Sequence, residues 1–214
     1  MGSPLKMIPH GEKGFLITFC GLDGCGKTTM IQLLRNELQK QGREVVLTKQ
    51  PTENMRQSAI FRSFIDEKNT EQYDYRALSL LAASDRIQHI KQVILPALEE
   101  GKVVISDRYF YSCLANLRAR GYGTDQWIYD VAKYIPKPDC AFFLDVSVAT
   151  ALRRIRERPL EKDRPINLDL QHRLFCEYRR ICDENEGVLL NSEDGVEKTF
   201  TAMLQELEKR RILK

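Results

Sequence analysis

The stretch from Gly21 to Thr28 constrains this chain more than any other part of its sequence. It reads Gly-Leu-Asp-Gly-Cys-Gly-Lys-Thr and fits the pattern G-x-x-x-x-G-K-[ST] of a phosphate-binding loop, or P-loop. Glycines at Gly21, Gly24 and Gly26 let consecutive backbone N–H groups curve around an anion without a Cβ in the way. Lys27 is then expected to reach the β- and γ-phosphates of a nucleotide, and the Thr28 hydroxyl to bind Mg²⁺.

The residues on either side of this loop support the same interpretation. The run Phe15–Cys20 is typical of a buried strand, and an apolar helical face follows the loop at Met30, Ile31, Leu33, Leu34 and Leu38. A helix in this place directs its N-terminal N–H groups and its partial positive charge at a bound phosphate. This context favours a nucleotide site over the alternative, a glycine-rich turn that only joins a strand to a helix.

Apolar strand patterns alternate with helical patterns along the rest of the chain. Further strands are expected at residues 44–48, 103–106, 141–145 and 188–190, and helices at residues 60–65, 73–101, 149–158, 174–182 and 196–207. The alternation predicts an α/β fold, a P-loop NTPase-type three-layer domain with a mainly parallel sheet of about five strands and helices on both faces. Residues 1–13 are expected to form a flexible N-terminal lead-in, and residues 14–214 a single domain.

Charged residues follow three of these strands at the edge where a parallel sheet binds its ligands. Lys49 comes after the strand at 44–48, the pair Asp107-Arg108 after the strand at 103–106, and Asp145 ends the strand at 141–145. A buried strand has little other use for adjacent opposite charges at its end, so we expect Asp107 to hold Mg²⁺ or its waters and Arg108 to serve the site. Asp145 fits two roles, a second carboxylate near the metal or a cap for the next helix near Ser147.

A second cluster of cations lies within residues 153–165 and consists of Arg153, Arg154, Arg156, Arg158, Lys162 and Arg164. Leu152 and Ile155 occupy the core side of this helix, so Arg154 and Arg158 share one outward face. A solvated helix face is the alternative for such a run. Beside a P-loop, this density of guanidinium groups favours a lid at about 153–165 that closes over a transferring phosphoryl group.

Composition excludes several other classes of protein. A formal charge of +3 over 214 residues is too small to indicate nucleic-acid or membrane binding. No apolar run approaches the length of a membrane span, and the N-terminus lacks the apolar stretch of a secretory signal. The six cysteines show no C-x-x-C pair, and the three histidines are scattered, so we expect reduced thiols in a cytoplasmic protein without a zinc site. Cys25 has two interpretations, a small residue that the loop tolerates, which we favour, and a reactive thiol among the phosphate-binding amides.

The order of these motifs from Phe15 to about Arg164 resembles the thymidylate kinase family. The loop fits the family pattern G-x-D-G-x-G-K-[ST]-T through Thr29. Asp107-Arg108-Tyr109 and Ser112 match the family's D-R-[YH] motif and the serine that follows it. Pro138-Asp139 with Leu144-Asp145-Val146 matches its P-D-x-x-x-x-L-D-V strand. Its basic lid is matched by Leu152, Arg154, Arg158 and Asp163-Arg164. Cys25 stands where some members carry a loop arginine, so the chain resembles the bacterial type with arginines in the lid.

The resemblance implies roles for further residues. Asp23 would meet the sugar 3′-hydroxyl of the acceptor nucleotide, and Arg86, in the helical Asp85-Arg86 pair, would contact its base. Arg164 would join the P-loop in binding ATP, with Mg²⁺ as the metal. Lys49 and Arg108 would hold the acceptor phosphate. The resemblance also implies a homodimer.

The departures from the family pattern gather in the acceptor site. The family's T-R-E-P is Thr48-Lys49-Gln50-Pro51 here, which replaces an arginine fork by a point charge. The phenylalanine that stacks on thymine is Ala82, and the Tyr-Gln pair after the motif serine is Asn116-Leu117. An aromatic wall from elsewhere in the chain has four candidates: Tyr73, Tyr75, Phe110 and Tyr111.

Three functions remain open from the sequence. The first is a Mg²⁺- and ATP-dependent nucleoside monophosphate kinase that converts dTMP to dTDP, with Lys27, Arg108, Arg154 and Arg158 stabilising the transferring group. The second is a related kinase for a different nucleotide or another small acceptor, because three acceptor positions differ together. The third is a nucleotide-binding regulatory protein without turnover.

Overall fold

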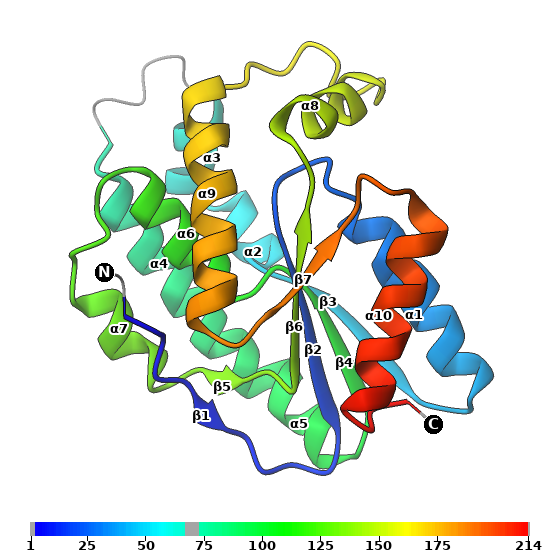
Figure 1. Ribbon diagram of the computed structural model, residues 1–214. Helices are drawn as coiled ribbons and strands as arrows, with labels where there is room; N and C mark the ends of the chain where they lie inside the picture. Colours follow the sequence, from blue (N-terminus) through cyan, green and yellow to red (C-terminus); the bar gives the residue numbers. More distant parts are fainter. Residues whose placement is uncertain (1–2, 67–72, 214) are drawn as a thin grey trace.

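Five parallel strands form the centre of the molecule in the computed structural model, which describes residues 3–66 and 73–213. They are β2 (Phe15–Cys20), β3 (Val45–Lys49), β4 (Val103–Asp107), β6 (Cys140–Asp145) and β7 (Val188–Asn191), in the spatial order β3-β4-β2-β6-β7 (Figure 1). Each neighbouring pair is parallel. The predicted strands and the α/β class are therefore confirmed.

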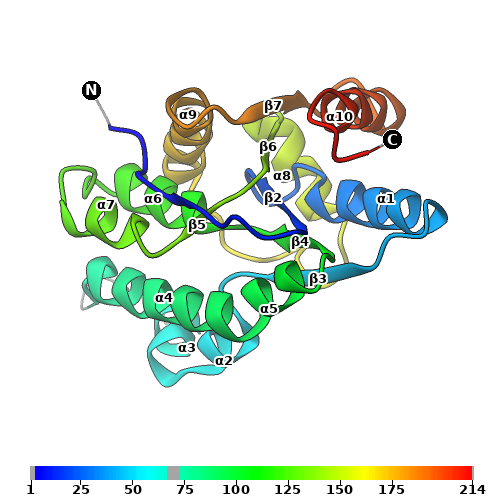
Figure 2. The same ribbon diagram turned by 90° about the horizontal axis from the view of Figure 1, so that it is seen from below.

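Helices cover both faces of this sheet, which confirms the three-layer prediction. One face carries α1 (Lys27–Lys40) and α10 (Val196–Lys209), and the other carries α4 (Tyr75–His89), α6 (Phe110–Ala119) and α9 (Leu168–Glu184) (Figure 2). The shorter helices are α2 (Glu53–Gln57), α3 (Ala59–Asp66), α5 (Leu95–Glu99), α7 (Trp127–Ala132) and α8 (Val148–Arg156). Among the described residues, no helix is both long and apolar enough to cross a membrane.

Burial follows the position of each strand in the sheet. In the central strands β2, β4 and β6 almost every side chain is buried, whereas the edge strands β3 and β7 alternate between covered and exposed residues. A strand with helices on both faces has no solvated side, which explains its continuous apolar run. The Phe19 and Phe142 rings, 5.4 Å apart between centroids, join β2 to β6 in this core.

The helix expected at residues 73–101 is divided into three pieces. Helix α4 passes into a π-helical turn, η1 (Ile90–Ile94), and α5 begins there with Pro96 in its first turn. Proline has no N–H to donate, so it fits a helix start, and Gly101 lies just past the end of α5. The helices α2, α6 and α7 were not expected from the sequence pattern.

The expected N-terminal lead-in is tied to the domain along residues 3–13. Leu5 is buried in the core, and β1 (Ile8–Pro9) pairs with β5 (Pro136–Lys137). The His10 Nε2 atom lies 2.9 Å from the Asp139 carboxylate, beyond β5. The strand pairing and the His10–Asp139 contact both join residues 3–13 to residues that are distant in sequence, and no local sequence pattern indicates them.

Strand register brings the predicted polar residues to one edge of the sheet. Lys49 is level with Asp107, and Asp107 is level with Phe19, just before the P-loop. Asp145 ends β6 at the same edge, but it does not cap the next helix. Its carboxylate pairs with Arg179 on α9 at 3.1 Å, and the Ser147 hydroxyl caps α8 by accepting from the Thr150 N–H.

Candidate active site

The P-loop connects β2 to α1, as the sequence predicts. Gly26 takes the left-handed conformation at the N-cap of α1, with φ of 99°, and no side chain caps this helix. The first N–H groups of α1 are thus left to the loop and to an anion. Gly24 lies so close to α8 that a Cβ atom would come within 2.3 Å of the Ala151 carbonyl oxygen. The loop is therefore packed against the helix that begins the predicted lid.

Lys27 lies beneath the loop, where only 7% of its surface is exposed. Its ammonium group donates to the Gly21 and Leu22 carbonyl oxygens at 3.2 and 2.8 Å and lies 3.6 Å from the Cys25 sulfur. Thr28 and Thr29 are exposed at the start of α1, where a metal ion and phosphates can reach them. Cys25 has no exposed surface, which favours its interpretation as a small packing residue.

Arg108 joins the P-loop to the helices on the opposite face of the sheet. Its backbone takes a positive φ of 67°, and its guanidinium donates to the Gly21 carbonyl oxygen at 3.3 Å and to the Tyr178 hydroxyl at 2.9 Å. The other terminal nitrogen donates to the Asp23 carboxylate at 2.5 Å. A non-glycine residue in the left-handed region costs energy that packed surroundings must offset, and such residues are frequent at functional sites.

Asp23 holds two arginines at once. Its second carboxylate oxygen accepts from Arg164, in the lid, at 2.9 Å. The Arg108 charge holds the pKa of Asp23 well below its usual range, against the opposing effect of burial. Burial also disfavours the charge of Arg108, but Tyr178 and Asp23 hold the pKa of that guanidinium above its ordinary value. Loop, strand end and lid thus meet at one carboxylate.

Asp107 presents an oxygen that fits a hard cation. One carboxylate oxygen lies 3.8 Å from the Lys49 ammonium, and the other is buried without any hydrogen-bond partner. Within the part of the chain that the structure describes, no group of three His, Cys, Asp or Glu residues is arranged to hold a metal ion. P-loop enzymes do not need one, because Mg²⁺ there takes its ligands from a Ser or Thr hydroxyl, one carboxylate, phosphates and water. The Asp107 and Thr28 oxygens fit that set.

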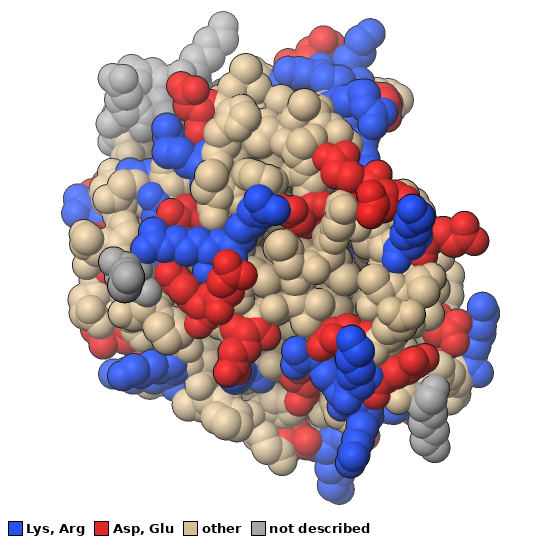
Figure 3. Space-filling model, in the orientation of Figure 1, with Lys and Arg blue, Asp and Glu red and all other residues tan. Residues whose placement is uncertain are grey.

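The lid arginines Arg154, Arg158 and Arg164 have three partners, which are Ser192, Glu161 and Asp23. Basic side chains gather over α8 and the segment after it (Figure 3), but Arg154 donates to the Ser192 carbonyl oxygen at 2.9 Å, whereas Arg158 pairs with Glu161 at 3.0 Å. Arg164 pairs with Glu161 as well as with Asp23. Of the five arginines at residues 153–165, all of which the structure describes, only Arg164 pairs with the P-loop carboxylate of Asp23.

A cavity of about 290 Å³ opens beside the P-loop and was not predicted from the sequence. Its lining comes from the P-loop, α1, α8 and the turn after β7, and includes Gly24, Gly26, Thr29, Arg154, Arg158, Ser192, Gly195 and Val196. The Ser192 hydroxyl donates to the Cys25 carbonyl oxygen at 2.9 Å and fixes this turn against the loop. The turn follows the carboxyl end of an edge strand, where parallel sheets bind their ligands. That position in the sequence is the signal by which this turn can be assigned to the site.

The residues expected to recognise the acceptor base lie on facing sides of α4 and α6. Arg86 is 3% exposed, donates to the Ala82 carbonyl oxygen at 2.9 Å, and has a buried Nε atom without a partner. Ser112 is buried, and its carbonyl oxygen accepts from the Asn116 side chain at 2.9 Å. The buried Nε atom of Arg86, beside the small Ala82, is a donor that a ligand with a hydrogen-bond acceptor would satisfy.

Of the four candidate aromatic rings, Tyr75 is linked to Asn116 through Arg120. The Arg120 guanidinium lies over its ring at 3.9 Å and donates to the Asn116 side-chain oxygen at 2.7 Å. Tyr73 contacts Phe64 edge-on at 6.5 Å between ring centroids. Phe110 and Tyr111 are 0% and 2% exposed in the core, so they cannot stack on a base.

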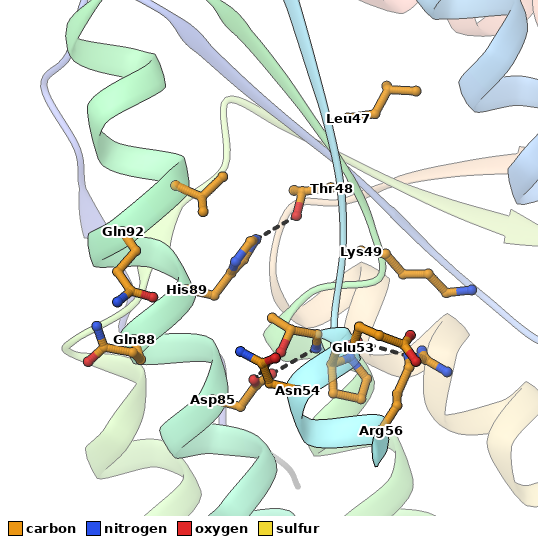
Figure 4. A pocket seen from close by; sticks show the side chains of 13 residues that line it. Leu47, Thr48, Lys49, Glu53, Asn54, Arg56, Asp85, Gln88, His89 and Gln92 are labelled. Atoms are coloured by element: carbon orange, nitrogen blue, oxygen red, sulfur yellow. Dashed lines mark hydrogen bonds between the residues drawn. The ribbon is translucent and has the colours of Figure 1, made fainter. Parts of the chain in front are cut away.

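A larger cavity of about 480 Å³ lies between the end of β3, α2 and α4 (Figure 4). Lys49 lines it, together with Thr52, Arg56, Asp85 and His89. The Asp85 carboxylate accepts from both the Thr52 N–H and the Thr52 hydroxyl. Arg56 was missed at the level of sequence because it lies outside every recognised motif.

Comparison with known proteins agrees with this arrangement. A sequence model of the family described as Thymidylate kinase matches residues 19–203. The chain is 40% identical over 173 residues to a protein of Pyrococcus horikoshii named "Probable thymidylate kinase", covering 80% of this chain and 84% of that protein. It is 38% identical to the corresponding protein of Pyrococcus abyssi, covering 87% and 92%, and 30% identical to the "Thymidylate kinase" of Finegoldia magna, covering 92% and 99%. With its P-loop, its Asp107-Arg108 strand end and its basic lid in the family order, the chain belongs to the thymidylate kinase family.

Proposed function

We propose that the protein is a Mg²⁺- and ATP-dependent nucleoside monophosphate kinase that converts dTMP to dTDP. The observation that carries this proposal is the Asp23 carboxylate, which pairs with Arg108 at 2.5 Å and with Arg164 at 2.9 Å. This junction gathers the P-loop, the end of β4 and the lid around one carboxylate. Relatives named thymidylate kinase support the choice of acceptor.

Phosphoryl transfer needs positioning and neutralisation of charge more than covalent chemistry. In the proposed reaction Lys27 neutralises the β- and γ-phosphates of ATP, and Arg108 lies between the transferring group and the acceptor phosphate. Arg154, Arg158 and Arg164 complete the positive charge when the lid covers ATP, and they exclude water. Mg²⁺, held through Thr28 and by Asp107 or its bound waters, would supply further charge on the phosphate oxygens.

The cavity beside Ser192 fits the base of the donor nucleotide. Its lining includes the apolar residues Met30 and Val196 next to the P-loop. A purine ring needs apolar groups of this kind on its face. In this proposal Lys49 and Arg108 hold the acceptor phosphate, Asp23 meets the sugar, and Arg86 with Ser112 and Asn116 surrounds the acceptor base near Ala82.

The structure also supports an alternative proposal, in which the acceptor is not dTMP. Ala82 gives the base slot no ring, and the available ring, Tyr75, is covered by Arg120 at 3.9 Å. Loss of one base stack costs about 1–3 kcal/mol, which is enough to change the preferred nucleotide. A kinase of the same mechanism for another nucleotide or small acceptor therefore remains the second candidate.

The deciding experiment measures ADP release with Mg-ATP and a panel of ribo- and deoxynucleoside monophosphates. Turnover confined to dTMP, or to dTMP and dUMP, supports the proposal, and turnover of another monophosphate supports the second candidate. Nucleotide binding without turnover of any acceptor would support the third function, a nucleotide-binding regulatory protein.

Lys27→Ala should lower turnover at least about 100-fold with the fold intact, because it removes a charge from the transferring group. An unchanged rate in this variant contradicts the P-loop assignment.

We also propose a cytoplasmic homodimer. All six cysteines are free thiols, in keeping with a reducing compartment. Helix α4 exposes Leu80 by 49% and Ile87 by 36%, two apolar residues at helical spacing on one side. Light scattering on the purified protein tests the dimer, and a monomeric mass at micromolar concentration contradicts it.

A further inference from the structure

Helix α2 brings an arginine to the end of β3 that no recognised motif contains. Arg56 lines the same cavity as Lys49, and in Figure 4 both side chains extend to the same side of the β3 backbone. The charges that act on Arg56 include those of Arg108, Asp107 and Asp23 as well as that of Glu53 on its own helix. Cations from β3, α2 and the end of β4 thus surround one region.

The Arg56 side chain is held in place, but its donor fork is not used. Its Nε atom donates to the Pro51 carbonyl oxygen at 3.0 Å. Among the side chains that the structure describes, neither terminal nitrogen has a hydrogen-bond or carboxylate partner. Burial, followed by the Arg108 charge, lowers the pKa of this guanidinium. A half-buried cation beside another cation is expected where an anion binds between them.

Hydrogen bonds from a residue of α4 hold the start of α2 in place, and they thereby set the position of Arg56. Asp85 accepts from the Thr52 N–H at 2.8 Å and from the Thr52 hydroxyl, while that hydroxyl caps α2 at the Met55 N–H. Met55, one residue before Arg56, is 4% exposed and anchors the helix. Asp85 is therefore a positioning residue for Arg56, although it does not contact it.

Lys49 alone is a poor ligand for a phosphate monoester. Its ammonium is a point charge, and it lies 3.8 Å from the Asp107 carboxylate, which competes for it. An arginine offers two parallel N–H donors that match two phosphate oxygens. Resting on the proposed function, we propose that Arg56 supplies the bidentate fork for the phosphate of the acceptor nucleotide, so that the fork has moved from the end of β3 to helix α2.

The test compares the variants Arg56→Gln, Arg56→Lys and Lys49→Arg, and the double variant Lys49→Arg/Arg56→Gln, in steady-state kinetics with dTMP and Mg-ATP. Arg56→Gln should raise the KM for dTMP about 10- to 100-fold, the range for a lost hydrogen bond to a charged group, and change the KM for ATP less than about twofold. Arg56→Lys should recover little of this loss, because an ammonium lacks the fork. The double variant should recover a large part of it.

A binding readout separates phosphate recognition from a structural effect. The wild type should bind dTMP more tightly than thymidine in calorimetry, and Arg56→Gln should remove most of this difference while thymidine binding stays the same. Thr52→Ala, which loosens the start of α2, should also weaken dTMP binding. Gln57→Ala is the matched control, because this exposed side chain donates to Glu53 on the same helix at 3.0 Å.

The outcomes distinguish the inference from the proposed function. An unchanged KM for dTMP in Arg56→Gln, or an equal loss of dTMP and thymidine binding, overturns the role of Arg56 while the kinase assignment stands. A wild type that neither binds nor phosphorylates any nucleoside monophosphate overturns both. Turnover of a different monophosphate keeps the inference only if Arg56→Gln raises the KM for that acceptor.

Discussion

Arg108 carries a buried positive charge at the point where strand, loop and lid meet. Its hydrogen bonds run to Gly21, Asp23 and Tyr178, and the Tyr178 hydroxyl donates to Ser112 at 3.2 Å. Burial raises the pKa of Tyr178 to about 12, so this hydroxyl stays a neutral donor at physiological pH. The chain of polar contacts orients the guanidinium without a second carboxylate. Single substitutions along it should therefore change both stability and acceptor binding.

Replacing Asp23 by Asn should destabilise the protein by about 1–2 kcal/mol, because Arg108 loses its counter-charge while the amide keeps the shape. Because the folded-state pKa of Asp23 is depressed, its contribution is present above the pKa of an unfolded carboxyl, about 4, and is lost as pH falls below it. Urea unfolding at pH 7 and pH 3 measures both effects. Asp183→Asn, at an exposed carboxylate, is the control and should change neither value.

His89 should make the free energy of unfolding depend on pH near neutrality. Its ring bonds to Thr48, and burial lowers its pKa, with Asp85 opposing the shift. The unfolded chain binds a proton at this residue below about pH 6.5 and the folded one resists it, so stability decreases as pH falls from 7.5 to 5.5. His89→Gln should flatten this part of the profile. An equally steep profile, or the same flattening in the exposed control His172→Gln, would refute the assignment.

At the scale of elements, the P-loop and α8 form one packed unit. Gly24 has φ of 80° and faces the Ala151 carbonyl oxygen, and the Ile155 side chain would lie 3.1 Å from an added Cβ atom. The Gly24 backbone is thus packed against both the backbone and a side chain of α8, at the base of the lid. A displacement of α8 must move the loop, and this couples the two parts of the proposed active site.

Gly24→Ala should destabilise the protein by roughly 2 kcal/mol more than Gly42→Ala, because both positions have positive φ but only Gly24 lacks space for a Cβ atom. Gly42 has nothing within 4 Å of an added Cβ atom. Thermal unfolding of both variants, with ATP affinity measured alongside, gives the comparison. ATP binding should weaken only in Gly24→Ala. Equal destabilisation of the two would show that the contact with α8 is not tight in solution.

At the scale of the whole molecule, a lid contact spans most of the chain. Arg164 follows α8 in the segment before α9, and its ion pair with Asp23 joins residues that are 141 positions apart. Both side chains are partly exposed, 46% for Arg164 and 40% for Asp23, so the pair is a weak, breakable contact. A lid must open and close during turnover, and a contact of this strength permits that.

Arg164→Ala should loosen the segment at 157–166 without unfolding the domain. Hydrogen exchange of its amides should rise, and saturating ATP should protect them less than in the wild type. Arg153→Ala serves as the matched control, because Arg153 pairs with Glu157 on the exposed side of the same region. Indistinguishable exchange in Arg164→Ala and wild type would mean that the Asp23 contact does not hold the lid.

The sequence by itself determined the parts of this protein whose physics is local. Glycines in a loop, a continuous apolar strand and a helical apolar stripe act within a few residues, so the P-loop and the five strands could be predicted, and parallel strand ends placed Lys49 and Asp107 on one edge. Only the tertiary structure decided which side chains meet there. The Asp23 junction, the turn at Ser192, the cover on Tyr75 and the position of Arg56 all join segments distant in sequence. Such contacts depend on the packing of several elements at once, and no periodicity or short motif encodes them.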